Sequence, residues 1–522
     1  SMQESHPLSV HLLQLQNKIL ILTACAAGIG GTFQYGYNIS IINAPTSYIQ
    51  RFMNETWLER TGTPLGSDVI LLLWSFTVSA YPLGGLTGAI AAGPMAIMLG
   101  RKTSLLLNNV FVIIAAVLSG FSRMAKSFEM IILSRFFTGL NAGISMNIQP
   151  MYLAESAPKK LRGAVALTSA SFTALGLLVG QVVGLRELLG AENSWPLLLA
   201  SNAVPALIQL MALPWFPESP RYLLIDRGDK ESCISALQKL RGHCDLSAEL
   251  EEMLAEQAAT HGQRPKKPWE LFQDRAVRWQ LLSIVVLSSA MQLCGNDSMY
   301  FYAAYVFQEA GIPQEKIPYV VIGTGSCELI TSVTSGGNQG AASVPLISPC
   351  SLWLQARISW MPYLSVICIF AYILSFGIGP AGVTGVLPTE VFDQMSRPAA
   401  YVICGSLLWF NLFLVGTNGS NTHISATSRS FWSASALRSM LASSFLRQRE
   451  SPSWKSRRSS RNGISNLTPM HFPTKALRRS SPLCCSRRQK GQREEGGICR
   501  TFSSGSILLR GHKEVIGLMR AL

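Results

Sequence analysis

The sequence has few charged residues. Asp, Glu, Lys and Arg make up 14% of its 522 residues, whereas a soluble domain carries about a quarter. Apolar stretches of about 20 residues recur through the first part of the chain, and each can cross a hydrocarbon core of roughly 30 Å as a helix. The scarcity of charge therefore argues against a soluble domain and predicts an all-α membrane protein.

The sequence also lacks the patterns that mark metal, cofactor and catalytic sites. There is no C-x-x-C, no His/Cys group at zinc spacing, no nucleophile–base pair and no phosphate-binding loop. Several of the 11 cysteines, such as Cys25 and Cys327, fall inside apolar runs, where cysteine behaves as a small hydrophobe. We therefore expect no metal, no cofactor, no catalytic residue and no enzyme activity.

Acidic residues are nearly absent from one segment. Residues 417–522 hold 19 Lys and Arg against 4 Glu and no Asp, which gives +15, the whole formal net charge of the chain. The remainder has 44 − 19 = 25 bases and 29 − 4 = 25 acids. The chain therefore changes character near position 416, and the basic Ser/Arg-rich tail is expected to be disordered.

The apolar runs divide the chain into four parts. We predict an N-terminal half of six spans (1–216), a central cytoplasmic loop (217–279), an incomplete C-terminal half (280–416) and the tail (417–522). About ten spans are recognisable, at approximately 19–41, 69–91, 103–122, 127–150, 164–185, 196–216, 280–306, 318–335, 362–387 and 398–416.

Lys and Arg in the loops predict the orientation. The loops after spans two, four and six carry Arg101, Arg162 and other bases, so this side, and the N-terminus with it, is expected to be cytoplasmic. Asn54 begins an N-glycosylation sequon in the loop after span one, on the opposite side. The two signals agree, and Asn54 is predicted to carry a glycan.

Two spacings predict how the spans pack and repeat. Gly176, Gly180 and Gly184 recur every four residues, as do two further glycine pairs, which favours close helix packing in lipid. Glu155 precedes Arg162 by seven residues, and Glu390 precedes Arg397 by the same distance. Repeated halves of six spans around a long central loop are typical of transporters that rock around a midplane site.

Several motifs together resemble the sugar porter family of the major facilitator superfamily, and within it the animal facilitative glucose/fructose transporters. They are Gln34–Asn38 with Ile42–Pro45, Gly100–Lys102, the E-x-x-P-x-x-x-R-G run from Glu155, Pro217–Arg221 and Gln292–Gly295. The resemblance implies the major facilitator fold, two six-helix halves around a central site. It also implies facilitative uniport of glucose or fructose by alternating access, most simply in the plasma membrane.

The resemblance also carries a substrate site. Gln292 is expected to bind sugar hydroxyls, Trp409 to line the site and Tyr300 to lie near the external gate. A sugar needs amide, hydroxyl and aromatic partners. The full predicted set is Asn38, Gln292, Asp297, Tyr300, Glu328, Trp409 and Asn411. Asp297 and Glu328 are acids where relatives carry asparagine, and they act as neutral hydroxyl partners, exchange a proton, or face a wet cavity without a role.

Charged residues at cytoplasmic helix ends form a predicted gate that ties the halves together. The set is Arg101, Glu155, Arg162, Glu218, Arg221, Glu390 and Arg397. Exposed pairs contribute only about 0–1 kcal/mol each, which suits a gate that opens readily. The alternative is that these charges only anchor helix ends at the headgroups.

Two segments depart from the family pattern. Residues 336–359 lack the expected span nine, and the tail 417–522 resembles translation in a wrong reading frame or retained non-coding sequence; an evolved tail that binds acidic lipid or RNA is the rival. The expected partners are a hexose and the bilayer, and no nucleic acid. A transport-inactive membrane protein and proton-coupled transport through Asp297 and Glu328 remain alternatives.

Overall fold

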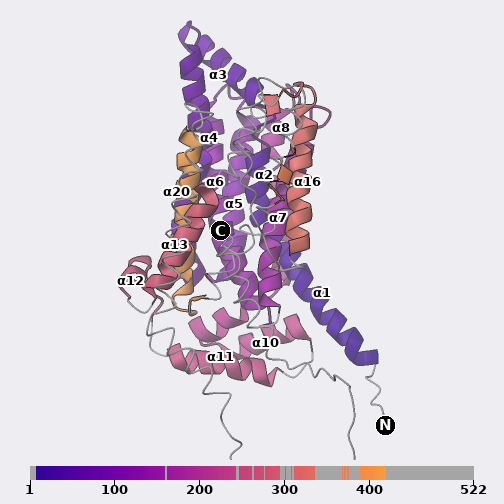
Figure 1. Ribbon diagram of the computed structural model, residues 1–522, viewed down its shortest axis with the longest axis vertical. Coiled ribbons are helices and arrows are strands. Elements are labelled where there is room, and N and C mark those ends of the chain that lie inside the picture. The colour runs from indigo at the N-terminus through magenta and orange to yellow at the C-terminus, as the bar shows by residue number, and fades with distance from the viewer. Residues whose placement is uncertain are drawn as a thin grey trace, which may run out of the picture.

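The computed structural model describes residues 7–158, 161–242, 246–260, 264–274, 277–293, 311–335 and 391–418, with isolated positions between 300 and 388. Every regular element in these ranges is a helix, and most run side by side along one bundle (Figure 1). Residues 336–359, most of the predicted span near 362–387, and residues 419–522 lie outside the described part.

The N-terminal half contains nine α-helices in the described part. Their bounds are α1 Pro7–Ile29, α2 Thr32–Ser40, α3 Thr46–Thr61, α4 Ser67–Met98, α5 Arg101–Phe121, α6 Glu129–Ser156, α7 Arg162–Val183, α8 Trp195–Ala200 and α9 Ala203–Ala212. The 3₁₀ turn η1 (Leu213–Trp215) ends this half. The predicted spans of this half coincide with α1 and α2 together, α4, α5, α6, α7, and α8 and α9 together.

The first predicted span is found at Lys18–Ser40, and it consists of two helices rather than one. α1 ends at Ile29 and α2 begins at Thr32, after a turn at Gly30 and Gly31. The backbone N–H of Thr32 donates to Gln149 Oε1 at 2.5 Å. A Cβ on Gly31 would lie 2.0 Å from the same oxygen, so only glycine leaves room for this bond.

The glycine spacings are confirmed as packing sites. A Cβ on Gly139 would lie 2.0 Å from the carbonyl oxygen of Tyr81, and one on Gly84 would lie 2.0 Å from that of Phe136, so α4 and α6 are in backbone contact. A Cβ on Gly176 would lie 2.2 Å from the carbonyl oxygen of Phe33, so α7 packs directly against the backbone of α2. Small residues thus let backbones approach where lipid gives no hydrophobic reward.

The central segment, expected to be a polar loop, is largely helical. It contains η2 (Tyr222–Asp226), α10 (Lys230–Arg241), α11 (Ser247–Thr260) and α12 (Pro268–Gln273). Asp229 caps α10 by accepting from Ser232 N at 3.0 Å, and Leu224, Cys233, Leu237 and Met253 form a small apolar core. Burial, with Glu249 and Asp229 nearby, raises the pKa of the Cys233 thiol to about 11.

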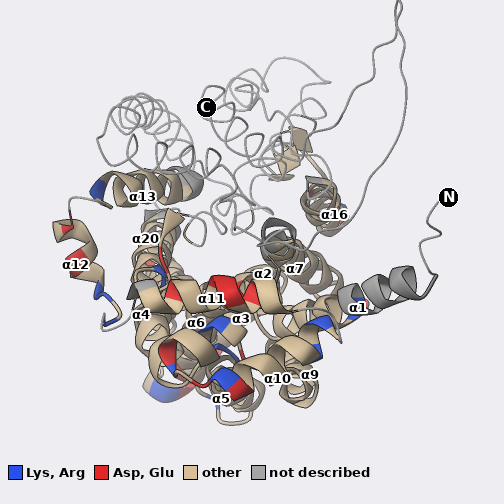
Figure 2. Ribbon diagram, turned by 90° about the horizontal axis from the view of Figure 1, so that it is seen from below, with Lys and Arg blue, Asp and Glu red and all other residues tan. Residues whose placement is uncertain are grey.

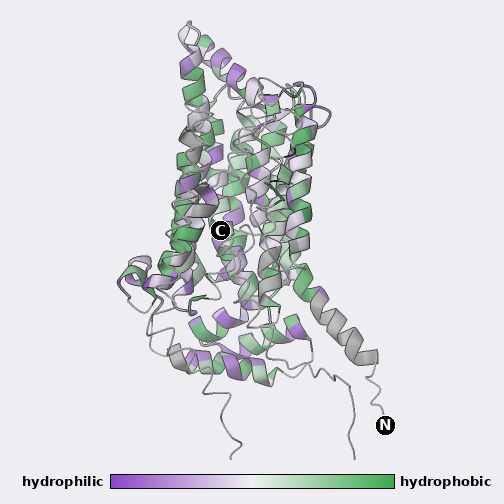
Figure 3. Cartoon of the chain, in the orientation of Figure 1, coloured by the Kyte–Doolittle hydropathy of each residue, from purple (hydrophilic) through white to green (hydrophobic). Residues whose placement is uncertain are grey.

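The two ends of the bundle differ. α10, α11 and α12 lie at the lower end in Figure 1, and α3 extends from the upper end. Lys, Arg, Asp and Glu gather on the lower-end helices (Figure 2), while the bundle between the ends is predominantly apolar (Figure 3). By length and composition, five segments of the described part can cross a membrane: Lys18–Ser40, Ser67–Met98, Arg101–Phe121, Trp195–Trp215 and Arg397–Leu414.

The described part of the C-terminal half contains α13 (Arg278–Leu293), α16 (Ile317–Ser335) and α20 (Arg397–Asn418). α20 packs along α4 of the first half, and α16 packs along α7. These two seams are where the halves meet, and α20 places residues of the second half beside the lower end of α6.

Candidate functional site

The best-defined polar site lies at the lower end, where α5, α6, η2 and α20 converge. Arg101 Nε lies 3.0 Å from Glu155 Oε2, and Arg397 Nη1 of the second half lies 3.7 Å from Glu155 Oε1. The side chains of Arg101 and Glu155 are 1% and 0% exposed. The contact therefore joins the first half to the second through charges that are almost fully desolvated.

Three further polar side chains complete this site. Arg101 Nη1 lies 2.8 Å from Asp226 Oδ2, and Gln394 Nε2 donates to Glu155 Oε1 at 2.9 Å. Ser219 Oγ donates to Glu155 Oε2 at 2.6 Å. We call Arg101, Glu155, Asp226, Gln394 and Arg397 the lower-end cluster.

Asp226, Gln394 and Ser219 were not among the predicted gate residues. Ser219 and Gln394 lie inside the Pro217–Arg221 motif and the Glu390–Arg397 repeat, but only the fold shows that they reach Glu155, and no motif marks Asp226. Burial raises the pKa of the Asp226 carboxyl above its usual range, against the lowering effect of Arg101.

The predicted gate is corrected on energetics. Its charges were expected to form exposed pairs of about 0–1 kcal/mol each. Arg101, Glu155 and Arg397 are buried instead, at 1%, 3% and 5% exposure. Removing one partner of a buried pair leaves an uncompensated charge and costs about 3–5 kcal/mol.

Two predicted gate residues make contacts within the first half and the central segment. Glu218 accepts from the backbone N–H groups of Arg101 and Lys102 at 3.1 and 2.9 Å, so it caps the N-terminus of α5. Arg221 pairs with Glu256, and also lies 3.7 Å from Glu252. These residues anchor the central helices to the bundle.

The two remaining gate residues are not placed. Glu390 and the Arg162 side chain lie outside the described part of the chain. The spacing suggested Glu155 with Arg162 and Glu390 with Arg397. The described contacts instead pair Glu155 of one repeat with Arg397 of the other.

Trp409 of α20 lies at the centre of an aromatic cluster between the halves. Its ring meets those of Tyr35 and Tyr81 edge-on, with centroids 5.4 Å away in each case. A Cβ on Gly85 would lie 2.1 Å from the Trp409 ring. Trp409 Nε1 and Asn411 Nδ2 are buried donors with no hydrogen-bond partner among the described residues. Such orphaned donors are costly unless a ligand or water accepts from them.

Three further predicted substrate residues of the second half are described. Gln292 of α13, Tyr300 and Glu328 of α16 are all buried. Tyr300 OH donates to Glu328 Oε2, and the carbonyl oxygen of Tyr300 accepts from Asn43 Nδ2 of the first half at 2.6 Å. Asp297 lies outside the described residues. The structure thus brings Tyr300 and Glu328 together and ties them to the end of α2.

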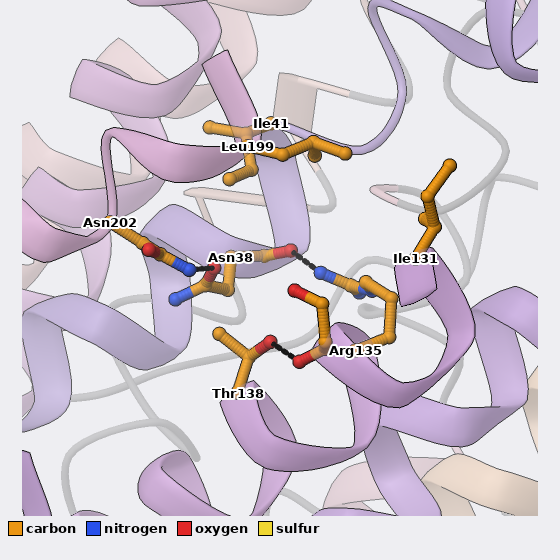
Figure 4. Close-up of a pocket in the computed structure, with 8 residues that line it drawn as sticks. Asn38, Ile41, Ile131, Arg135, Thr138, Leu199 and Asn202 are labelled. Atoms are coloured by element: carbon orange, nitrogen blue, oxygen red, sulfur yellow. Dashed lines mark hydrogen bonds between the residues drawn. The ribbon is translucent and has the colours of Figure 1, made fainter. Parts of the chain in front are cut away.

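Asn38 faces the interior of the first half. It borders a small cavity, of ≈ 10 Å³, with Arg135 and Asn202 (Figure 4). Arg135 Nη1 donates to Asn38 O at 2.9 Å, and its guanidinium lies 4.5 Å from the centroid of the Tyr81 ring. Arg135 was not among the predicted site residues, although a lone arginine within an apolar run is a functional candidate by default.

Asn54 lies within α3 rather than in a loop, which corrects the expectation from the sequon. Its side chain is half-buried, and Oδ1 accepts from Leu65 N at 2.9 Å, while Thr56 is buried. α3 lies at the opposite end of the bundle from α10 and α11 (Figure 1). The predicted separation of Asn54 from the cationic loops therefore holds in the fold.

Sequence comparisons place these features among known proteins. Residues 23–437 match the family model described as "Sugar (and other) transporter". The chain is 62% identical over 416 residues to Solute carrier family 2, facilitated glucose transporter member 11 of Homo sapiens, covering 77% of this chain and 84% of the relative. It is 42% identical over 412 residues to member 5 of Bos taurus, covering 76% and 82%.

The fold is similar to that of solved transporters. A structure of the major facilitator superfamily proton:xylose symporter XylE, bound to 6-bromo-6-deoxy-D-glucose, superposes with a TM-score of 0.68. The match covers 82% of this chain and 95% of that one at 20% identity, so it shows the fold alone. The inward open conformation of XylE from E. coli gives a TM-score of 0.62, also at 20% identity.

Proposed function

The chain belongs to the sugar transporter family, and on this premise we propose that it carries glucose and fructose down their gradients by alternating access. The proposal places the substrate between the two halves and the lower end in the cytoplasm. It makes the plasma membrane the site of action and leaves no role for a catalytic residue. The first support is that the relatives described above are facilitated glucose transporters.

The observation that carries the proposal is the contact of Arg397 and Gln394 with Glu155. A carrier that alternates between its two sides must break contacts at one end while it makes them at the other. Glu155 belongs to α6 of the first half, and Arg397 begins α20 of the second. Separating the halves at the lower end breaks this contact, so the lower-end cluster acts as the cytoplasmic gate.

The substrate site is proposed beside Trp409. A sugar hydroxyl is both donor and acceptor, so its oxygens can accept from Trp409 Nε1 and Asn411 Nδ2, whose partners are missing in the described part. Gln292 contributes an amide from α13, and Tyr300 with Glu328 closes the side toward α2. Asn38 and Asp297 complete the proposed set. Asn38 lies on α2, the helix that also carries Tyr35, whose ring meets that of Trp409.

Uniport is favoured over proton coupling by the surroundings of Arg135. In the described part this buried cation contacts the carbonyl oxygen of Asn38 and the ring of Tyr81, and no carboxylate pairs with it. A backbone carbonyl has no proton to exchange, and a phenol ordinarily ionises only near about pH 10. Proton coupling through Asp297 and Glu328 is the second candidate, because a buried carboxyl such as Glu328 can release a proton when solvent reaches it.

Uptake by proteoliposomes tests the proposal. The purified full chain should take up radiolabelled glucose and fructose without a sodium or proton gradient, and each unlabelled hexose should inhibit uptake of the other. Trp409→Phe keeps an aromatic ring and removes one donor, so it should raise the half-saturating concentration about threefold to tenfold. Trp215→Phe, at an 85% exposed tryptophan, is the matched control.

Three results separate the candidates. Uptake that follows the hexose gradient alone supports uniport. Acidification of the vesicle lumen on hexose entry, lost in Glu328→Gln, establishes proton coupling instead. No uptake above protein-free vesicles, from a chain that unfolds cooperatively, identifies a transport-inactive membrane protein.

A further inference from the structure

Asp226 has no place in the gate that the sequence motifs predict, yet it shares the central cation of the lower-end cluster. Arg101 meets Glu155 through Nε at 3.0 Å and Asp226 through Nη1 at 2.8 Å. The Arg101 guanidinium also lies 4.5 Å from the centroid of the Tyr222 ring. Asp226 and Glu155 therefore share one arginine, and Asp226 can act on Glu155 through it.

Asp226 also lies at the seam between the halves. Its side chain is 12% exposed, and Gln394 of the second half hydrogen-bonds to it as well as to Glu155. Withdrawal of α20 and Gln394 removes this cover and lets water reach the carboxyl. Opening the lower end thus changes the environment of Asp226 directly.

The surrounding charges decide which carboxyl can take up a proton. Charged and titratable groups from four elements face Asp226 or its partners. They are Arg101 of α5, Glu155 of α6, Tyr222 of η2, Arg227 in the turn after η2, and Arg397 of α20. Arg397 in turn lies near Arg221 and Glu256. Glu155 contacts two arginines, whereas Asp226 contacts one. Asp226 is therefore the member of the cluster that protonates first.

We propose that Asp226 is a positioning residue of the cytoplasmic gate and that its protonation favours the closed lower end. The consequence of this proposal for transport rests on the function proposed above. Ionised Asp226 competes with Glu155 for Arg101 in a desolvated site. Protonated Asp226 leaves Arg101 to Glu155, which then holds Arg397 and Gln394 across the seam.

The sign follows from burial. In the closed cluster, burial raises the pKa of Asp226 above its usual range. Exposure to water on opening returns the pKa toward that range. The closed form consequently binds the proton more tightly, so acid pH favours closure and alkaline pH favours opening. Each unit of difference in pKa changes this equilibrium by up to about tenfold.

Hydrogen exchange in lipid nanodiscs measures gate closure without requiring transport. Peptides from the end of α6, from η2 and from the start of α20 are followed from about pH 4, close to the ordinary pKa of aspartate, up to about pH 8. Exchange is expressed relative to that of the unfolded chain at each pH. The wild-type chain should gain about threefold to tenfold in protection at the acid end.

Asp226→Asn copies the protonated form and should show high protection that no longer varies with pH. Asp226→Glu keeps a titratable group, so its protection should still vary with pH. This variant keeps the test decisive if Asp226→Asn fails to fold. Asp229→Asn is the matched control, because an asparagine caps α10 as well as aspartate and this residue is exposed. It should behave as wild type.

A wild-type chain without pH-dependent protection overturns the proposal, and so does pH dependence that survives in Asp226→Asn. Failure of the proposed function gives a different result. Proteoliposomes of every variant would then take up no hexose, while the exchange pattern of Asp226→Asn against Asp229→Asn stays as expected.

Discussion

The ion pairs of the lower-end cluster differ in character from those at the upper end of the bundle. At the lower end, Arg101 and Glu155 are 1% and 0% exposed and reach the second half through Arg397. At the upper end, Arg60 and Glu129 are 41% and 51% exposed, and their pair joins α3 to α6 within the first half. The pairs differ in exposure to solvent rather than in closeness. The N–O distance of the exposed Arg60–Glu129 pair, 2.5 Å, is even shorter than the 3.0 Å of Arg101–Glu155.

This difference indicates where conformational energy is concentrated. An exposed pair is screened by solvent and salt and adds at most about 1 kcal/mol. A buried cluster that spans two rigid halves is sensitive to every partner, because a charge left alone there cannot be hydrated. The lower end can thus act as a gate, whereas the upper-end pairs only hold α3 in place.

The largest effect is expected from Glu155→Gln. This change leaves Arg101 and Arg397 without the carboxylate they share, so the free energy of unfolding should fall by about 3–5 kcal/mol. Chemical unfolding in detergent micelles measures it. Glu59→Gln, which removes an exposed partner of Lys126, is the control and should differ little from wild type. Equal losses in the two variants would show that burial does not distinguish the ends.

A smaller loss is expected from Arg397→Gln. Arg101 still pairs with Glu155, so only the contact between the halves weakens, by about 1–3 kcal/mol. Hydrogen exchange at the start of α20 should accelerate while that of α5 stays unchanged. Arg278→Gln, at an exposed arginine of the same half, serves as the control. Equal acceleration in α5 and α20 would place Arg397 in general packing rather than in the seam.

Arg60→Ala should matter least among the charged sites. Its pair with Glu129 is exposed, so the free energy of unfolding should fall by less than about 1 kcal/mol, and the loss should shrink further in about 1 M salt. Unfolding at low and high ionic strength checks this. A loss as large as that of Glu155→Gln would remove the contrast between the ends.

Asn54→Gln should leave stability unchanged and still report which end faces outward. If the lower end is cytoplasmic, Asn54 is exposed to the glycosylation machinery during synthesis, before α3 folds. Glycosidase should then increase the mobility of the wild-type chain from cells and leave Asn54→Gln unaffected. A shift that persists in Asn54→Gln while the other sequons are mutated away would contradict the proposed orientation.

The sequence predicted the spans of the first half well, because each consists of a long apolar run that needs no tertiary context. It predicted Glu155 and Arg397 through a local repeat. It could not predict their pairing, or the roles of Asp226 and Gln394, because those contacts form only when distant segments meet. The helices of the central segment were missed for a related reason. They are amphipathic and too polar to be read as spans, and they pack on their own small core.

A double-mutant cycle on Glu155 and Arg397, run beside one on Arg60 and Glu129, tests the account most directly. Each cycle uses the two single Gln or Ala variants and the double variant, with the free energy of unfolding in micelles as the readout. The account predicts a coupling energy of at least about 1.5 kcal/mol for Glu155 with Arg397 and below about 0.5 kcal/mol for Arg60 with Glu129. Equal coupling energies, or a larger one at the upper end, would contradict it.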